Sequence, residues 1–148
     1  KDRVNSILTM KELNVHQGRV MSFVAQEGTP MADWKTPPRQ DELLVIAALR
    51  LVLQDRLIPA SLDVDGIKGL KDRLKAGANV VTSLIPPSSG LAGVSNSTLD
   101  IEEGHRTVAG VENVIKDLDL EIALPDSYKK WVETEKQESR RQKSGAAF

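Results

Sequence analysis

Apolar residues recur along this chain in segments that alternate between strand-like and helix-like patterns. Short apolar runs, typical of buried strands, cover residues 19–25, 56–60 and 79–85. Apolar residues at spacings of three and four, which predict helices, follow each run over residues 41–53, 65–75 and about 101–117. Strict alternation of this kind is typical of parallel strands joined by helical crossovers, so we expect an α/β fold.

Further elements are predicted at both ends of this alternating body. A short amphipathic helix over residues 2–13 precedes the first strand. A short strand at 120–124 and a helix that begins at Pro125 follow the last unit. From Glu133 onward almost every residue is charged or polar, which predicts a frayed or disordered tail. We therefore divide the chain into a body, residues 1–118, and an extension, residues 119–148.

Two segments bear on how this body packs. The helix over residues 43–53 is apolar apart from Arg50, so we expect it to be buried on most sides. The loop after the third strand, residues 86–96, is rich in Gly, Ser and Pro, and it is either a phosphate-binding loop or a flexible connection. Three strand–helix units cannot close an eight-stranded barrel, which takes about 250 residues. The sheet is therefore open, or the chain is part of a larger barrel.

Composition excludes several classes of function. Aromatic residues make up 3% of the 148 residues and the net charge is −1, which argues against a nucleic-acid-binding surface. The chain has no cysteine, so it cannot by itself hold an iron–sulfur cluster or a thiolate zinc site. Neither His16 nor His105 has a partner at metal-ligand spacing, and no metal site is expected. Because no apolar run is long enough to cross a bilayer, we expect a cytoplasmic protein without membrane contact.

Three polar residues at strand ends are candidates for chemistry. Arg19 begins the first predicted strand, and Ser61 and Asp63 follow the second. An arginine can hold a carboxylate through two parallel hydrogen bonds, and an aspartate beside a hydroxyl can hold an ammonium group. Together they suit an amino acid. The alternative is that Arg19 is a surface residue, Ser61 a turn hydroxyl and Asp63 a helix cap.

Several stretches of the chain resemble the methylornithine synthases, which are radical S-adenosylmethionine (SAM) enzymes of pyrrolysine biosynthesis. The matching stretches lie at 19–21 (RVM), 26–30 (QEGTP), 56–63 (RLIPASLD), 76–79 (AGAN) and 86–87 (PP). The resemblance extends over about residues 5–120 and is most specific from 56 to 87.

This resemblance implies a fold and an activity. The family fold is a radical SAM barrel of the TIM type, and the chain is similar to its C-terminal part. That part comprises about three βα units, the sixth to the eighth, over residues 1–118, with a C-terminal helical extension over 119–148. Family enzymes isomerise L-lysine to 3-methylornithine by means of SAM and a [4Fe–4S] cluster. The implied partners are a lysine-like substrate, SAM and the missing N-terminal half of the barrel.

The resemblance also gives individual residues a role. By position, Arg19 is expected near the substrate carboxylate, and Ser61 and Asp63 near its amino groups. No catalytic residue is implied within the chain.

The implied SAM contact lies elsewhere. The segment expected near the adenosine part of SAM comprises Phe23, Val24, Ala25 and Gln26. Ala25 stands where the family pattern has a proline, and this departure bears on that contact.

The absence of cysteine sets a limit to these implications. The CxxxCxxC cluster loop of the family lies in the N-terminal half of the barrel, so this chain alone is expected to be inactive. Two alternatives remain. The chain is part of a sister radical SAM protein, similar to biotin synthase, with another substrate, or it is a non-catalytic half-barrel that binds a small molecule.

Overall fold

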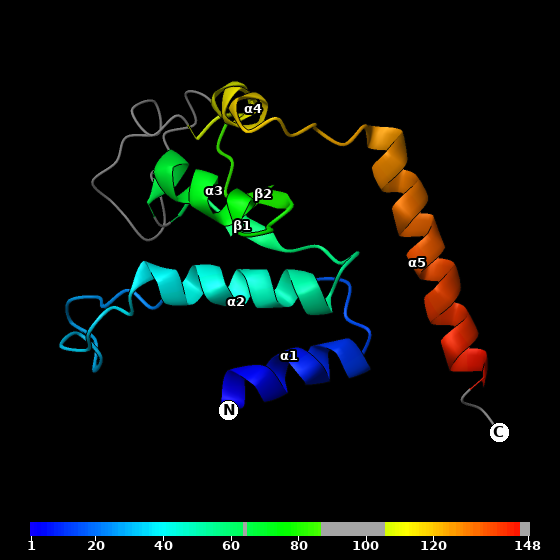
Figure 1. Cartoon of the computed structure of the whole chain (residues 1–148), viewed down its shortest axis with the longest axis horizontal. Coiled ribbons are helices and arrows are strands. Elements are labelled where there is room, and N and C mark those ends of the chain that lie inside the picture. Colours follow the sequence, from blue (N-terminus) through cyan, green and yellow to red (C-terminus); the bar gives the residue numbers. More distant parts are fainter. Residues whose placement is uncertain (64, 87–105, 146–148) are drawn as a thin grey trace. The chain divides into compact units, whose positions relative to one another are not determined.

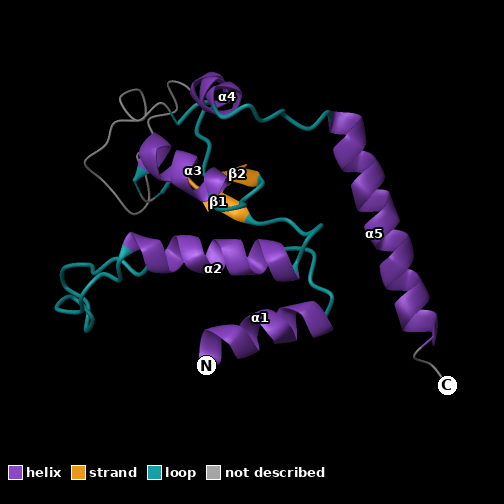
Figure 2. Ribbon diagram, in the orientation of Figure 1, coloured by secondary structure: helices purple, strands orange, loops and turns teal. Residues whose placement is uncertain are grey.

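A computed structural model describes residues 1–63, 65–86 and 106–145 of the chain (Figure 1). Its backbone forms two compact units, Lys1–Val114 and Ile115–Phe148. Helices dominate the described residues, which contain just two short strands (Figure 2). The mixture of helices with a parallel strand pair is that of an α/β fold. The division into a body and an extension after residue 118 stays a prediction.

The sheet of the first unit is a parallel pair. Strand β1 (Pro59–Ser61) is buried along its whole length and lies beside β2 (Val80–Thr82), with Ser61 opposite Thr82. Helix α3 (Gly66–Lys75) connects the two strands and packs on β1 (Figure 1). This β–α–β connection is the crossover that the alternating pattern predicts. Both strands are shorter than the apolar runs that predicted them.

Helix α2 (Arg39–Val52) forms where the sequence predicts a helix, but one side of it is exposed. Ile46 and Leu49 lie on the buried face, whereas Leu44 and Leu51 are 68% and 77% exposed. Leu44 and Leu51 are two helical turns apart on the side of α2 that no described element covers. Leu44 and Leu51 are therefore exceptions to the prediction that this helix is buried on most sides, since the other residues from 43 to 53 are buried or half-buried.

Helix α1 (Asp2–Glu12) packs on α2, and α2 packs in turn on α3. The core between these elements is aliphatic, as the small number of aromatic residues predicts. Its members are contributed mainly by α2, the β1 region and α3: Ile46, Leu49, Leu53, Ile58, Ala60, Leu62, Leu70 and Leu74. Burial of this apolar surface is the main source of stability for the unit.

The predicted strand over residues 19–25 does not form. Parallel pairing begins at an isolated bridge between Gln17 and Leu57, where Gly18 donates a backbone hydrogen bond to Leu57. Residues 18–26 then continue without regular secondary structure. A parallel strand exists only where a neighbouring strand accepts and donates along its length, and the pairing with the β1 region ends at this bridge.

The C-terminal region is more helical than predicted. Helix α4 (Val108–Asp117) lies within the predicted helix at 101–117, but residues 101–105 of that prediction lie outside the described residues, as does most of the loop at 86–96. No strand forms at 120–124. Helix α5 (Pro125–Gly145) continues far beyond Glu133, so the prediction of a frayed tail is wrong over residues 133–145, and residues 146–148 lie outside the described residues. Lys, Glu, Gln and Arg are good helix formers, which explains why a polar sequence is helical here.

Two side-chain pairs, each spanning one helical turn, support α5. Lys136 donates to Glu133 at 2.8 Å, one turn earlier, and the rings of Tyr128 and Trp131 stack with their centroids 5.9 Å apart. Among the residues that the structure describes, no helix has both the length and the hydrophobicity needed to cross a membrane.

Candidate functional site

The candidate site lies where the two parallel strands end. Ser61 is the last residue of β1, and Ser83 directly follows β2. Because Ser61 lies opposite Thr82 in the register, the chain brings Ser61, Asp63 and Ser83 together just beyond the carboxyl ends of both strands. Open and closed α/β sheets place their ligand sites at this edge. Ser83 has a positive φ of 66°, a conformation that non-glycine residues adopt infrequently.

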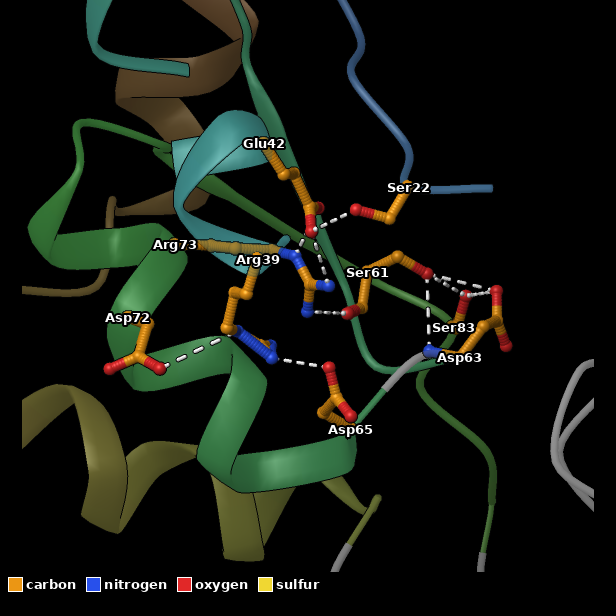
Figure 3. A network of polar contacts seen from close by, with 9 residues as sticks. All are labelled: Ser22, Arg39, Glu42, Ser61, Asp63, Asp65, Asp72, Arg73 and Ser83. Carbon is orange, nitrogen blue, oxygen red and sulfur yellow. Dashed lines mark hydrogen bonds and ion pairs between the residues drawn. The ribbon is translucent and has the colours of Figure 1, made fainter. Parts of the chain in front are cut away.

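Asp63 is the centre of a hydrogen-bond cluster (Figure 3). Its Oδ2 accepts hydrogen bonds from Oγ of Ser61 at 2.9 Å and from Oγ of Ser83 at 2.5 Å. The Asp63 N–H donates to the Ser61 hydroxyl at 3.2 Å, and the two serine Oγ atoms lie 3.0 Å apart. These bonds leave the carboxylate with one fixed orientation.

Arg106 reaches the same carboxylate from a distant part of the sequence. Its Nη2 lies 2.6 Å from Oδ1 of Asp63, and its side chain is 2% exposed. The Arg106 carbonyl accepts a hydrogen bond from the N–H of Ile85, which holds this residue beside the chain that leaves β2. Arg106 Nε is also buried, and it has no hydrogen-bond partner among the described residues.

These contacts determine the charge of Asp63. Burial by itself raises the pKa of the carboxyl group, but hydrogen bonds from Ser83, Arg106 and Ser61, together with the positive charge of Arg106, outweigh it. The pKa of Asp63 therefore lies below its ordinary value. Asp63 is consequently a carboxylate at neutral pH, suited to accepting hydrogen bonds from a cation and unsuited to donating a proton.

The interpretation of Asp63 as a helix cap is wrong. The residue at the N-terminal cap of α3 is Asp65, which has a left-handed conformation and whose side chain makes no capping hydrogen bond. The Asp65 carboxylate instead pairs with Arg39. Asp63 is thus engaged with the cluster and not with the helix end.

The structure does not bring Arg19 into this cluster. Arg19 is exposed and lies on the irregular segment after the isolated bridge. There it lines a hollow of about 370 Å³ that α1, α2 and residues 19–23 enclose. Among the described residues, no hydrogen bond or ion pair joins Arg19 to Ser61 or Asp63. The predicted role of Arg19 at a substrate carboxylate stays a prediction.

The segment predicted to contact SAM also lies outside regular structure. Phe23 packs edge-to-face on Trp34 with ring centroids 6.3 Å apart, and Val24 and Ala25 are half-buried. Gln26 is exposed and begins a turn, in which its carbonyl accepts a hydrogen bond from the Thr29 hydroxyl at 2.8 Å. Because no strand pairs with this segment, its backbone groups could serve a flat polar ligand such as adenosine. That SAM contact stays a prediction.

The residues do not fit an iron–sulfur cluster. The chain has no cysteine, and among the described residues no group of three His, Asp or Glu side chains could hold a metal ion. Any cluster used together with this chain must therefore be held by residues outside it.

Sequence reasoning missed Ser83 and Arg106. Ser83 stood within the predicted strand at 79–85, whereas β2 ends at Thr82, so the predicted bounds did not place Ser83 at a strand end. Arg106 stood within the predicted helix at about 101–117, and no local pattern shows that this residue lies beside the end of β1.

Comparisons with known proteins give a consistent result. The chain is 43% identical over 120 residues to the 3-methylornithine synthase of Methanosarcina acetivorans, and 44% identical over 113 residues to that of Methanosarcina barkeri. These matches cover 81% and 74% of the chain but 34% and 32% of the relatives. The chain thus spans about a third of the length of these relatives. No protein-family model matches the chain.

A structural comparison agrees with the sequence matches. A crystal structure of methylornithine synthase superimposes with a TM-score of 0.77 at 39% sequence identity. The superposition covers 86% of this chain and 38% of the solved chain. The described fold is therefore similar to part of that enzyme.

Proposed function

We propose a function from the premise that this chain is a methylornithine synthase-like radical SAM sequence, which corresponds to a C-terminal portion of such an enzyme. The chain supplies about three βα units and a C-terminal helical extension to a TIM-type barrel. Together with a cluster-bearing N-terminal portion, it takes part in the isomerisation of L-lysine to 3-methylornithine in the cytoplasm. By itself it is inactive, because it has no cysteine to hold the cluster.

The Asp63 cluster is the observation that supports this proposal most. A carboxylate held by two hydroxyls at the carboxyl ends of parallel strands is chemically suited to an ammonium group. Ser61 and Asp63 hold the amino groups of the substrate, and Ser83 and Arg106 fix the orientation of Asp63. Arg19 holds the substrate carboxylate.

The cofactors would supply the radical chemistry of the reaction. When bound, SAM and a [4Fe–4S] cluster supply the radical that removes a hydrogen atom from the substrate. The residues of this chain then have to orient the substrate and exclude water and competing reactions. Residues 23–26 form one wall of the SAM site, beside the substrate end of β1.

A reconstituted holoenzyme tests this function. The chain is joined to the cluster-bearing N-terminal portion of the Methanosarcina barkeri enzyme, and formation of 3-methylornithine from lysine is followed by mass spectrometry. We expect lysine-dependent product from the holoenzyme and none from the chain alone. A holoenzyme that contains its cluster and binds SAM, yet leaves lysine unchanged, would show that the substrate assignment is wrong.

A further inference from the structure

A second polar cluster lies behind the Asp63 site and contains a buried ion pair. Arg73 of α3 donates from Nε to Oε1 of Glu42 at 2.7 Å and from Nη2 to Oε2 at 3.2 Å. Both side chains are almost fully buried, with 2% and 4% exposure. Two parallel bonds between a guanidinium and a carboxylate fix the relative position of both groups.

The pair also reaches the chain on either side of it (Figure 3). The third nitrogen of Arg73, Nη1, donates to the main-chain carbonyl of Ser61 at 3.1 Å. The Ser22 hydroxyl donates to Oε2 of Glu42 at 3.0 Å. A continuous chain of hydrogen bonds therefore runs from Ser22, through Glu42 and Arg73, to the last residue of β1.

One end of this chain of hydrogen bonds lies at the proposed substrate site, and the other lies at the proposed SAM site. Ser61 belongs to the proposed amino-group site, and Ser22 directly precedes the proposed SAM segment, residues 23–26. No regular strand pairing holds residues 19–26 beside β1, because the parallel bridge ends at Gln17. Within the described residues, the Ser22–Glu42 bond thus gives this segment a polar attachment that leads back to the end of β1.

Stability alone is a weak explanation for such a pair. Desolvation of two charges offsets most of their attraction, and buried ion pairs can often be replaced by apolar residues without loss of stability. Apolar residues cannot, however, reproduce the directional hydrogen bonds of this pair. Arg73 uses Nε, Nη1 and Nη2 at once, so a carboxylate and a main-chain carbonyl from separate elements are held at set distances.

We propose that Glu42 and Arg73 are positioning residues that set the Ser61 end of the substrate site relative to the segment at residues 22–26. This inference rests on the proposed function, because it assigns substrate to the first of these places and SAM to the second. Neither side chain touches a ligand. Their effect is to hold the substrate amino group at a productive distance from the SAM side of the site.

Arg73→Lys in the holoenzyme tests the proposal. The lysine keeps a positive charge beside Glu42 but cannot bond both carboxylate oxygens and the Ser61 carbonyl. Displacement of a substrate by about 1 Å can reduce catalysis about 100-fold, so we expect kcat/KM for lysine to fall about tenfold or more. Lysine affinity, measured by calorimetry without turnover, should fall severalfold. Ser22→Ala, which removes one part-buried hydrogen bond and carries little risk of misfolding, should lower kcat more than it raises KM.

Arg39→Gln provides the matched control. Arg39 also joins α2 to α3, through Asp65 and Asp72, but it makes no bond to the end of β1. We expect this variant to lower the melting temperature without changing kcat or lysine affinity. If Arg73→Lys and Ser22→Ala keep wild-type kinetics, the positioning role is wrong. It is also wrong if their losses match those of Arg39→Gln at an equal loss of melting temperature.

Failure of the proposed function would look different. In that case the holoenzyme would neither bind nor convert lysine, whichever of these residues is changed. If lysine is converted by the wild type and Asp63→Asn prevents it, the proposed function stands, and the kinetics of Arg73→Lys alone decide whether Glu42 and Arg73 are positioning residues.

Discussion

Arg106 forms an ion pair with Asp63, with Nη2 and Oδ1 2.6 Å apart, although 43 positions of sequence separate the two residues. The arginine comes from the chain that precedes α4, and the aspartate follows β1. Arg106 contacts Oδ1 of Asp63, whereas both serine hydroxyls donate to Oδ2. Burial raises the pKa of this half-buried carboxyl group, and the hydrogen bond and positive charge of Arg106 help to lower it below its ordinary value.

Loss of this arginine should change the pKa of Asp63. In Arg106→Gln the positive charge and the charge-assisted hydrogen bond disappear, whereas burial still raises the pKa. We therefore expect the pKa of Asp63 to rise from its lowered value in the wild type. Titration of the Asp63 carboxyl carbon by NMR measures it. An unchanged pKa would mean that the serine hydroxyls alone keep Asp63 ionised.

The same ion pair predicts how stability depends on pH. Because the pKa of Asp63 is lowered in the folded state, its contribution to stability is present above the unfolded pKa of about 3.9. It is lost as the pH falls through the lower, folded pKa. As the pH is lowered from 5, the free energy of unfolding of Arg106→Gln should therefore fall less than that of the wild type. Urea unfolding at several pH values measures both. An equal loss in both proteins contradicts this assignment.

The buried pair of Glu42 and Arg73 predicts a coupling between two substitutions. Arg73→Met leaves Glu42 buried without its cation, which should lower the free energy of unfolding by about 3–5 kcal/mol. The double variant Glu42→Met with Arg73→Met should recover most of that loss, since no unpaired charge remains. Urea unfolding of the single and double variants measures the coupling. Additive losses would show that the two side chains do not depend on each other.

Substitution of Gly77 by alanine should create a local packing defect. It has a φ of 113°, and a Cβ at this position would lie 2.9 Å from Cβ of Arg50. Gly77→Ala should therefore cost about 2–5 kcal/mol, from backbone strain and overpacking together. Gly28 is the matched control, because its φ is 77° but no atom lies within 4 Å of a Cβ built there.

For Gly28→Ala we expect only the cost of the left-handed backbone, about 1–2 kcal/mol. Thermal unfolding of both variants separates the two contributions. Equal costs would mean that Arg50 moves aside, and that its hydrogen bond from Nε to the Gly77 carbonyl does not hold it in place.

The sequence predicted the elements that depend on local pattern. Helix α2 and helix α3 lie where apolar spacing places them. Ser61 and Asp63 were found because polar residues follow a short apolar run. These features depend on neighbours within a few residues, which a pattern records.

Features that depend on distant partners were not predicted. Residues 19–25 have the apolar pattern of a strand, but a strand also needs a neighbour along its length. The contact of Arg106 with Asp63 joins residues 43 positions apart, and the predicted helix that contains Arg106 does not show what it packs against, so no spacing rule reveals the contact. Helix α5 was missed beyond Glu133 for another reason, because polarity was taken as a sign of disorder where helix propensity decides.

The most direct test is the affinity of the reconstituted holoenzyme for lysine, measured by calorimetry for the wild type, Asp63→Asn and Asp65→Asn. Asp65 is the matched control, since its carboxylate lies two positions away and pairs with Arg39 outside the cluster. A charge-assisted hydrogen bond contributes about 1.5–3 kcal/mol, so Asp63→Asn should weaken lysine binding at least about tenfold, with SAM affinity unchanged. Asp65→Asn should bind lysine like the wild type. Equal lysine affinity for Asp63→Asn and the wild type would contradict the proposal that this chain holds the substrate amino groups.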